Sequence, residues 1–366
     1  MSTDKSVARI AIAISSRPGR AAAENPIYRG LQVAMDDLAA DASLPVSLEW
    51  RVCDDFGDHA ATKRFADELA ADPTVVGVIG PMGSGEAFVN APVFNAAGLA
   101  QVSPCASHPD LCRRGYQTFF RLVANENVQG GELARLARGY LNAQRAAIVH
   151  ANDLWAQTVA DLFTREYESL GGQVVSRQEY APTDRDFNGL IRATVVAEPE
   201  LVFCAVHPVE GPTISGGLRL AGLRVPFLGT DAMKTAFPLG GGEPDGEAYH
   251  THSGADFRRL PSAAQFRQAY AARFPEDSTY SPEAYDSAML LAEAIRRAGR
   301  PDRAAVLAAL RDLGAYDGVT GRIRFDASGE RLDAPISFYQ VRLTAGGREM
   351  HYLGMTSELL PASAAL

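Results

Sequence analysis

The sequence predicts an α/β protein with two doubly wound lobes, each built on a parallel β-sheet with helices on both faces. Short apolar runs alternate with amphipathic stretches of ten or more residues along the chain, and this alternation is typical of parallel sheets. The pattern starts afresh at residue 145. The 366 residues are also enough for two domains of ordinary size.

The first lobe begins with the strand Val7–Ile14, which is almost entirely apolar and therefore indicates burial on both faces. Apolar residues at i, i+3, i+4 and i+7 from Leu31 predict the helix that follows. Further strands are predicted at Val46–Val52, Val75–Ile79 and Leu99–Ser103, and helices at Tyr28–Ala40, His59–Ala71 and Glu86–Ala97.

The second lobe repeats this pattern. Its predicted strands are Arg145–His150, Gln173–Tyr180, Leu201–Val206 and Val225–Leu228, and its predicted helices are Leu154–Leu170, Phe187–Val196 and Ile214–Ala221. Later helices are predicted at Ala263–Phe274, Pro282–Ala298 and Arg303–Leu313, before a tail of strands, Gly321–Leu353, with turns at Ala327–Gly329 and Ala345–Gly347.

The composition excludes several classes of protein. Hydrophobic residues make up 46% and charged residues 22% of the chain, which excludes disordered and collagen-like chains. The formal net charge is −9, and the sequence contains no cluster of Lys and Arg. Both features argue against nucleic acid or an anionic membrane as a partner. No apolar run reaches the ~18 residues of a membrane-spanning helix.

The N-terminal segment Met1–Val7 is polar and lacks the apolar core of a secretory signal. We therefore expect a cytoplasmic protein if the chain is complete, and a periplasmic or otherwise extracytoplasmic one if a signal has been removed.

The segment Gly80–Ala87 (GPMGSGEA) follows a buried strand and precedes a helix. Its glycines let the backbone approach a ligand, and Ser84, followed by Gly85, stands where an N-cap is expected, so hydroxyl and N–H groups there suit a small carboxylate. Glu86 replaces the lysine of a phosphate loop. The alternative is an ordinary turn between a strand and a helix.

The segment Ser103–Leu111 (SPCASHPDL) also follows a strand. Ser107 is expected to cap a short helix that opens at Pro109. Because Ser84 and Ser107 follow neighbouring strands, we expect both hydroxyls to face one crevice and to hold one carboxylate together.

Three further candidates follow strands or begin helices. Asp231, in the segment GTDA, either balances a ligand ammonium group or caps the next segment. Trp155 and Tyr280 are either walls of a ligand cleft or structural aromatic residues. Asp54–Asp55 is expected to form a solvated turn rather than a pair of catalytic acids.

The sequence indicates no catalytic residue, no metal site and no cofactor. The seven histidines are scattered, and only His250 and His252 form a pair, without further ligands nearby. Ser84 has no visible base and Cys105 no Cys–His signature, so nucleophilic catalysis is unsupported. Cys105 and Cys112 either form a disulfide in an oxidising compartment or remain thiols.

Eight segments, in order and spacing, resemble the type I solute-binding proteins of ABC transporters. The group with the greatest resemblance is the leucine/isoleucine/valine-binding proteins with their amide-, urea- and aromatic-acid-binding relatives, from Arg9 to about Tyr352. The segments are YRGLQVAMDDL (28–38), CDDFGD (53–58), VVGVIGPMGSGEA (75–87), GLAQVSPCASHPDL (98–111), YQTFFRLVANENVQG (116–130), RAAIVHANDLWAQ (145–157), PFLGTDA (226–232) and YSPEAYDSAMLLAEAI (280–295).

The resemblance implies two lobes joined by three hinge crossovers that close over a ligand. The N-terminal lobe would comprise residues 1–121 and 253–328, and the C-terminal lobe residues 122–252 and 329–366, with the ligand cleft between them.

The resemblance also implies roles for single residues. In the family's amino-acid clamp, the hydroxyl and N–H groups at positions 84 and 107 and a backbone carbonyl at position 105 contact the ligand, and the acidic residue at position 231 takes its ammonium group. Trp155 corresponds to a tyrosine that covers the ligand, and Tyr280 to a neighbour of its side chain. Together with two positions at which the chain departs from the family, His207 and Arg17, the predicted ligand-binding set is Ser84, Gly85, Cys105, Ala106, Ser107, Trp155, His207, Asp231, Tyr280 and Arg17.

The chain departs from the family at several positions. The loop Ser15–Tyr28 lacks the Gly-rich run and the aromatic lid, and carries Arg17 and Arg20 instead. Where relatives often have a second-lobe tyrosine, the alignment passes through Val206 and His207. A larger pocket with arginine at its mouth favours a ligand with a polar or acidic extension. The disulfide of some relatives has no equivalent here.

The resemblance thus implies a non-enzymatic substrate-binding protein that delivers an amino acid or similar small carboxylate to a membrane ABC permease, as a monomer or dimer. The alternative is a cytosolic ligand-sensing regulator on the same fold that binds an amide, urea or aromatic acid. An α/β dehydrogenase is disfavoured because no dinucleotide-binding loop is present.

Overall fold

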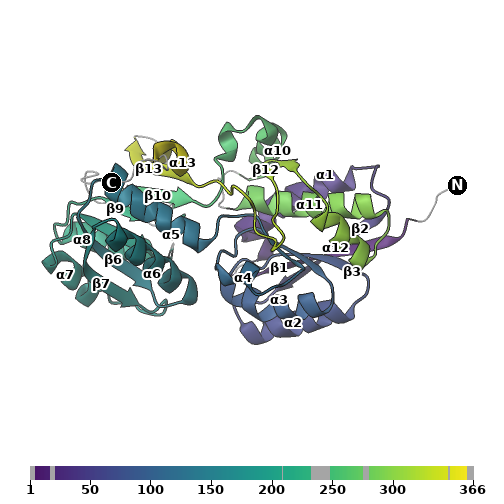
Figure 1. Cartoon of the computed structure of the whole chain (residues 1–366), viewed down its shortest axis with the longest axis horizontal. Coiled ribbons are helices and arrows are strands. Elements are labelled where there is room, and N and C mark those ends of the chain that lie inside the picture. Colours follow the sequence, from purple (N-terminus) through teal and green to yellow (C-terminus); the bar gives the residue numbers. More distant parts are fainter. Residues whose placement is uncertain are drawn as a thin grey trace. The chain divides into compact units, whose positions relative to one another are not determined.

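The computed structural model describes residues 5–16, 21–207, 209–231, 248–274, 280–344 and 347–360. The chain divides into two compact units (Figure 1). Unit 1 comprises Met1–Ala124 and Asp256–Ala334, and unit 2 comprises Asn125–Ala255 and Pro335–Leu366. The chain therefore passes between the units three times.

Unit 1 is built on a parallel sheet with the strand order β2-β1-β3-β4-β5. Its strands are β1 (Val7–Ile14), β2 (Ser47–Asp54), β3 (Val75–Ile79), β4 (Ala100–Ser103) and β5 (Phe119–Arg121). The strand order reverses between β1 and β3, and ligands of such sheets bind beyond the carboxyl ends of the strands at this point.

Helices cover both faces of this sheet, as the sequence predicts. Ile10 and Ile12 of β1 pack in one cluster with α1, α11 and α12, whereas Ala11 packs in another with α2 and α3, because successive strand side chains point to opposite faces. The helices of unit 1 are α1 (Pro26–Ala39), α2 (His59–Ala71), α3 (Ser84–Ala96), α4 (Asp110–Arg113), α10 (Ala264–Arg273), α11 (Ser281–Ala298) and α12 (Arg303–Arg311), with short 3-10 turns η1 (Ala22–Glu24), η3 (Phe257–Arg259) and η4 (Pro261–Ala263).

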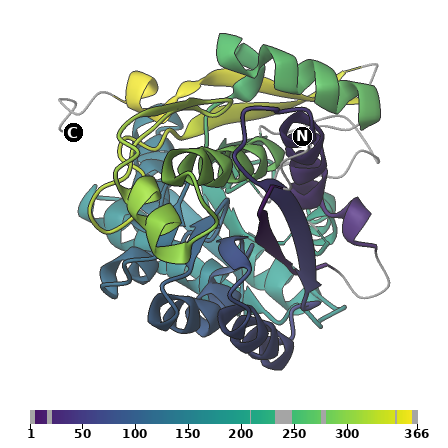
Figure 2. The ribbon, with the colours of Figure 1, turned by 90° about the vertical axis from the view of Figure 1, so that its right-hand side faces the viewer.

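Helices α1 and α11 lie side by side (Figures 1 and 2). Gly30 of α1 permits this contact, since a Cβ atom there would lie 2.1 Å from the carbonyl oxygen of Ser281. A two-stranded hairpin of β11 (Tyr316–Gly318) and β12 (Gly321–Ile323) completes unit 1.

Unit 2 contains a mixed sheet with the order β14-β13-β10-β9-β8-β6-β7. Its parallel part, from β7 to β10, repeats the strand order of unit 1, and β13 and β14 add to it as an antiparallel hairpin. The strands are β6 (Arg145–Ala151), β7 (Gln173–Tyr180), β8 (Leu201–Ala205), β9 (Phe227–Gly229), β10 (Ala248–His252), β13 (Ser337–Thr344) and β14 (Gly347–Met355). The turn predicted at Ala345–Gly347 lies partly outside the described residues.

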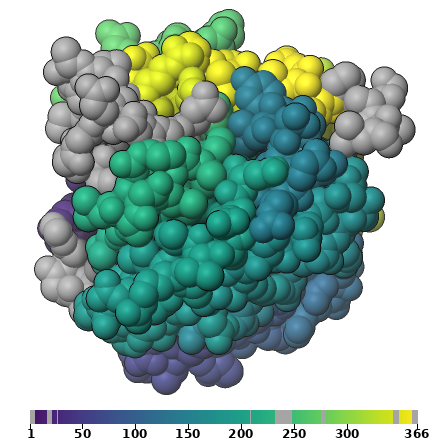
Figure 3. All heavy atoms as spheres, turned by 90° about the vertical axis from the view of Figure 1, so that its left-hand side faces the viewer, coloured from purple at the N-terminus to yellow at the C-terminus, as the bar shows by residue number. Residues whose placement is uncertain are grey.

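The helices of unit 2 come from distant parts of the chain. They are α5 (Glu126–Arg135), the π-helical turn η2 (Leu136–Tyr140), α6 (Leu154–Ser169), α7 (Asn188–Val196), α8 (Gly211–Leu220) and α13 (Thr356–Leu359). Figure 3 shows the yellow C-terminal segment beside the blue segment that contains α5 and η2, and Tyr140 of η2 packs edge-on against Phe338 of β13 with ring centroids 5.3 Å apart. None of the helices in the described part of the chain is long and apolar enough to cross a bilayer.

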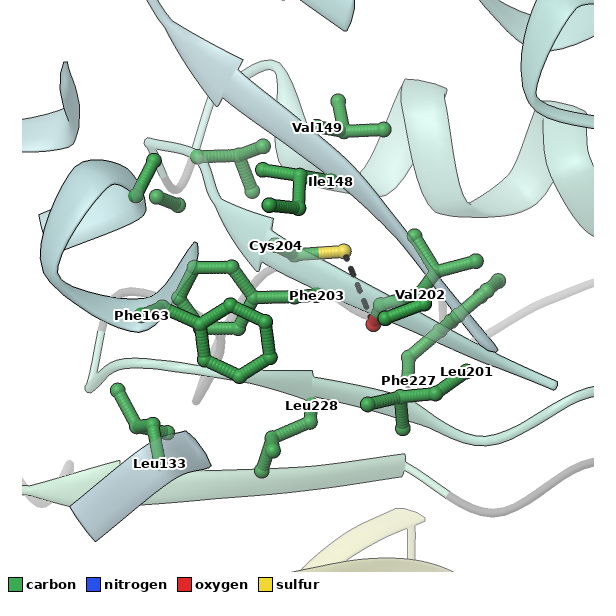
Figure 4. Close-up of a cluster of buried hydrophobic side chains, with 14 of the residues drawn as sticks. Leu133, Ile148, Val149, Phe163, Leu201, Val202, Phe203, Cys204, Phe227 and Leu228 are labelled. Carbon is green, nitrogen blue, oxygen red and sulfur yellow. Dashed lines mark hydrogen bonds between the residues drawn. The ribbon is translucent and has the colours of Figure 1, made fainter. Parts of the chain in front are cut away.

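An aromatic stack lies at the centre of the unit 2 core (Figure 4). Phe163 of α6 and Phe203 of β8 are both fully buried, and their rings stack with centroids 3.9 Å apart and planes 1° from parallel. The Cys204 thiol beside them donates a long contact of 3.9 Å to the carbonyl of Val202. The stack therefore joins helix α6 to the middle of the sheet.

Replacing Phe163 by leucine is expected to lower the free energy of unfolding by about 1–2 kcal/mol, because the stack is lost and leucine fills the site incompletely. Urea unfolding followed by circular dichroism measures this loss. The control Val196→Ala, at an 81% exposed position of α7, is expected to stay within about 0.5 kcal/mol of the wild type. Equal stability of the two variants would show that the stack contributes nothing.

Candidate functional site

Two segments leave neighbouring strands at the carboxyl edge of the first sheet. One follows β3 and enters α3 at Ser84 and Gly85, and the other follows β4 and contains Cys105, Ala106 and Ser107. Because β3 and β4 are paired in parallel, both segments leave the sheet at the same edge. The structure thus brings five of the predicted site residues to one edge of unit 1.

Hydrogen bonds join the two segments. The hydroxyl of Ser84 accepts a hydrogen bond from the backbone N–H of His108 at 3.1 Å. The thiol of Cys105 donates to the carbonyl oxygen of Met82, also at 3.1 Å. Ser84 and Ser107 are each only 6% exposed, so both hydroxyls lie in surroundings that contain little water.

Both predicted serine caps are wrong. The N-cap residue of α3 is Gly83, and Ser84 is the first residue of the helix. Helix α4 begins at Asp110, whose backbone N–H donates to Nδ1 of His108 at 3.2 Å. The imidazole therefore takes the role that the sequence analysis assigned to Ser107, because its ring reaches an N–H group two residues further on.

Packing within unit 1 accounts for one of the glycines in the first segment. Gly80 has a φ of 105°, and a Cβ atom there would lie 2.1 Å from the carbonyl oxygen of Ala13. A Cβ atom on Gly85 would lie 3.0 Å from Nε2 of His59. Gly80 is thus required by a neighbouring backbone group even without a ligand, whereas the ring of the exposed His59 side chain can move away from a larger residue at position 85.

Asp55 is buried, contrary to the solvated turn expected at Asp54–Asp55. The side chain is 4% exposed and accepts hydrogen bonds from the hydroxyls of Ser15 at 2.5 Å and Thr62 at 2.7 Å. It thereby fixes the segment that follows β1 at the same carboxyl edge. Arg17, expected next to the ligand, lies outside the described residues.

Tyr280 belongs to a different part of unit 1. It is the N-cap residue of α11 and has a left-handed backbone with φ 66°. Its half-buried side chain packs on the same hydrophobic cluster as Met82 and Cys105. This packing supports a structural role, and a ligand contact of Tyr280 stays a prediction.

The carboxyl edge of unit 2 carries the remaining candidates. Trp155, His207 and Asp231 follow β6, β8 and β9, which are consecutive neighbours in the parallel part of the sheet. The rings of Trp155 and His207 are in contact, with centroids 5.3 Å apart and planes inclined by 38°. Asp231 is half-buried and follows the fully buried Thr230.

A carboxylate that the sequence analysis missed orients this ring pair. Asp153 caps α6 by accepting the backbone N–H of Ala156 at 3.0 Å, and its other oxygen lies 2.5 Å from Nε2 of His207. Burial raises the pKa of Asp153, because it disfavours the ionised form. The hydrogen bonds from His207 and from the start of α6 lower the pKa by more, so it lies below the ordinary value. The carboxylate therefore stays charged and anchors the imidazole.

The two edges differ in the chemistry that they offer. Unit 1 presents hydroxyls and the N-terminus of α3, which suit an anion. Unit 2 presents a carboxylate and a pair of ring faces, which suit a cation and a flat or apolar group. Among the described residues, no group of three or more His, Cys, Asp and Glu is arranged to hold a metal ion, and Cys105 and Cys112 are separate thiols.

A surface groove of about 430 Å³ lies between α7 and α8. Its walls include Phe187, Ile191, Pro212 and Leu220, and none of the candidate residues lines it. The two strand-edge clusters, rather than this groove, are therefore the candidate site.

Comparison with known proteins identifies the family. The sequence profile of the family described as periplasmic binding protein matches residues 12–348. A Leu/Ile/Val-binding protein homolog of Brucella melitensis is 25% identical over 288 residues, which are 78% of this chain and 77% of that protein.

Two solved structures share the fold. The leucine binding protein LivK of Thermotoga maritima superposes with a TM-score of 0.82 at 21% identity, over 94% of this chain and 97% of its own. The branched-chain amino acid transporter substrate binding protein LivJ of Streptococcus pneumoniae, solved with isoleucine, superposes with a TM-score of 0.83 at 21% identity, over 95% and 99% of the two chains. Because the family profile spans most of the sequence, the chain belongs to the periplasmic binding protein family, with the type I fold.

Proposed function

We propose that the protein is the substrate-binding protein of an ABC transporter. It captures an amino acid or a similar small carboxylate without transforming it, in the periplasm, and delivers it to a membrane permease. The observation that carries this proposal is that two sheets of the same strand order present complementary groups at their carboxyl edges. Unit 1 has hydroxyl and N–H donors, and unit 2 has the carboxylate of Asp231 after β9 and the ring pair of Trp155 and His207 after β6 and β8.

In the proposed complex the ligand lies between the two units. Ser84 and Ser107 hold its carboxylate, and Asp231 holds its ammonium group. Such charge-assisted hydrogen bonds are strongest where water is excluded, so the units are expected to close over the ligand by bending at the three crossovers.

The rings of unit 2 bear on the choice of side chain. Trp155 and His207 present two adjacent ring faces that are partly polar, and Asp153 bonds the imidazole. An aromatic side chain can stack on these ring faces, and an acidic one suits Arg17, which the sequence predicts at the mouth of the pocket; an aliphatic side chain gains neither contact. We therefore propose that an aromatic or acidic amino acid binds better than leucine, although relatives are named for leucine, isoleucine and valine.

Isothermal titration against the proteinogenic amino acids and benzoate tests the proposal. At least one amino acid is expected to bind with a Kd below about 100 μM, and more tightly than the 2-keto acid that lacks its ammonium group. If no probe binds more tightly than about 1 mM, the protein does not carry such solutes. Tighter binding of leucine than of phenylalanine and glutamate would refute the proposed side-chain preference alone.

A further inference from the structure

A fully buried arginine lies next to the segment that carries Ser107. Arg121 is the last residue of β5, its side chain is 0% exposed, and β5 pairs with β4, from which that segment leaves the sheet. Burial of a guanidinium group is costly unless its donors find good acceptors. The acceptors of Arg121 therefore show what this residue holds in place.

Two of these acceptors are the carbonyl groups on either side of Ser107. Nη1 of Arg121 donates to the carbonyl oxygen of His108 at 2.7 Å and lies 3.3 Å from that of Ala106. One nitrogen atom thus contacts the residues before and after Ser107. The N–H of His108 donates in turn to Ser84, so the contacts extend to both predicted carboxylate-binding serines.

Glu330 fixes the orientation of the guanidinium group. Nε of Arg121 donates to Oε1 of Glu330 at 2.9 Å, and Nη2 donates to Oε2. A two-point contact of this kind sets the plane of the guanidinium as well as its position. The backbone supports it, since the N–H of Arg121 donates to the carbonyl of Gly329 at 3.0 Å and the N–H of Glu330 donates to Asp326 at 3.1 Å.

We propose that Arg121, oriented by Glu330, is a positioning residue for ligand binding, which holds the backbone around Ser107 in the shape that receives a carboxylate. The inference rests on the proposed function, because it concerns the same segment. Arg121 and Glu330 also stand shortly before the points, Ala124 and Ala334, where the chain leaves unit 1. This contact therefore holds the binding segment and lies close in sequence to two of the three crossovers.

Arg331 provides a matched control. It is also buried, at 4% exposed, and its guanidinium donates to the carbonyl groups of Leu122 at 3.1 Å and Thr320 at 2.9 Å. It stands beside Glu330 in the chain but bonds Leu122 and the β11–β12 hairpin instead of residues 104–109. Replacing it perturbs the same region of unit 1 without touching the carbonyl groups that flank Ser107.

The test compares Arg121→Lys, Glu330→Gln and Arg331→Lys. A lysine keeps the charge but has one nitrogen, which does not reach Glu330 and both backbone carbonyls together. Hydrogen–deuterium exchange without ligand is expected to be at least about tenfold faster over residues 104–109 in Arg121→Lys and Glu330→Gln, and unchanged there in Arg331→Lys. Titration with L-phenylalanine and with benzoate is expected to show affinity reduced about tenfold or more by Arg121→Lys, about three- to tenfold by Glu330→Gln, and less than about twofold by Arg331→Lys.

The double variant Arg121→Lys/Glu330→Gln tests whether the two residues act through their shared contact or independently of each other. It is expected to lose no more affinity than Arg121→Lys alone, since both residues act through the same bonds. Should Arg121→Lys fail to fold, the milder Glu330→Gln carries the same comparison with Arg331→Lys.

Two results overturn the inference. One is unchanged exchange over residues 104–109 in the Arg121 and Glu330 variants, which would show that the pair does not hold the segment. The other is faster exchange with unaltered affinity for both probes. If the wild type binds neither probe, the fault lies with the proposed ligands, and the exchange comparison still decides whether Arg121 positions the segment.

Discussion

Replacing Asp286 by alanine is expected to lower the free energy of unfolding by about 3–5 kcal/mol. Asp286 lies in α11, is 0% exposed, and accepts hydrogen bonds from the backbone N–H groups of Val319 at 2.9 Å and Thr320 at 2.8 Å and from the Thr320 hydroxyl at 2.6 Å. Alanine leaves these buried donors without their acceptor. It also removes a carboxylate whose charge acts on the buried Arg331.

A variant in the same region of unit 1, Asp317→Ala, serves as the control for Asp286→Ala. Asp317 lies in β11 and is exposed, so Asp317→Ala makes the same change of charge and is expected to cost less than about 0.5 kcal/mol. Chemical denaturation of both variants gives the comparison. A loss below about 1 kcal/mol for Asp286→Ala would mean that water or a shifted backbone replaces the carboxylate.

The loss is also expected to depend on pH. Burial raises the pKa of Asp286 to about 6 from 3.8, against the hydrogen bonds and the charge of Arg331 that favour its ionised form. A raised pKa means that the folded protein binds the proton more tightly than the unfolded chain, so this group adds stability as the pH falls and loses that contribution as the pH rises through about 6. Asp286→Ala should therefore cost about 1 kcal/mol more at pH 5 than at pH 7.5.

The fold was largely predictable because several of the buried strands are nearly pure apolar runs. β1, β3 and β8 follow directly from such runs, and α11 from its long apolar stripe. β5 was missed because its three residues include Arg121, whose charge argues against burial until its acceptors are known.

Helix α5 was missed for a different reason. Its sequence is polar and contains Gly130 and Gly131, which disfavour a helix. The structure shows why Gly130 is needed, since a Cβ atom there would lie 2.6 Å from the Cβ of Leu162 in α6. Helix propensity depends on the local sequence only, so it cannot predict that two helices pack closely at a glycine.

The candidate site, too, was predictable only in part. Its residues follow predicted strands, so the positions of Ser84, Ser107 and Trp155 could be expected from strand ends alone. The partners that orient such residues could not. Asp153 and His207 are 54 residues apart in the chain, and Arg121 and Glu330 are 209 apart. The sequence spacing does not predict such pairs. A charged residue inside an apolar run, as in FFRLV, does indicate that a partner for it lies in the core.

Replacing Asp231 by alanine is expected to weaken the binding of an amino acid by about 2–4 kcal/mol, or roughly 30- to 1000-fold, while the protein stays folded. The proposed role of this half-buried carboxylate is to hold the ligand ammonium group. A buried ammonium that loses its counter-charge pays the cost of leaving water without compensation. Titration of the variant with L-phenylalanine and L-glutamate measures the loss.

A second ligand and a second variant make this result specific. Benzoate has no ammonium group, so Asp231→Ala is expected to change its affinity less than about threefold or to raise it, since a negative charge leaves the site. Glu168→Ala removes an exposed acid of α6 and should leave every affinity within about twofold. Equal losses for amino acids and benzoate would point to a damaged site rather than a lost ammonium contact. Unchanged amino acid affinity would place the ammonium group against some other acceptor, and the assignment of Asp231 would then be wrong even though the carboxylate half of the site in unit 1 stands.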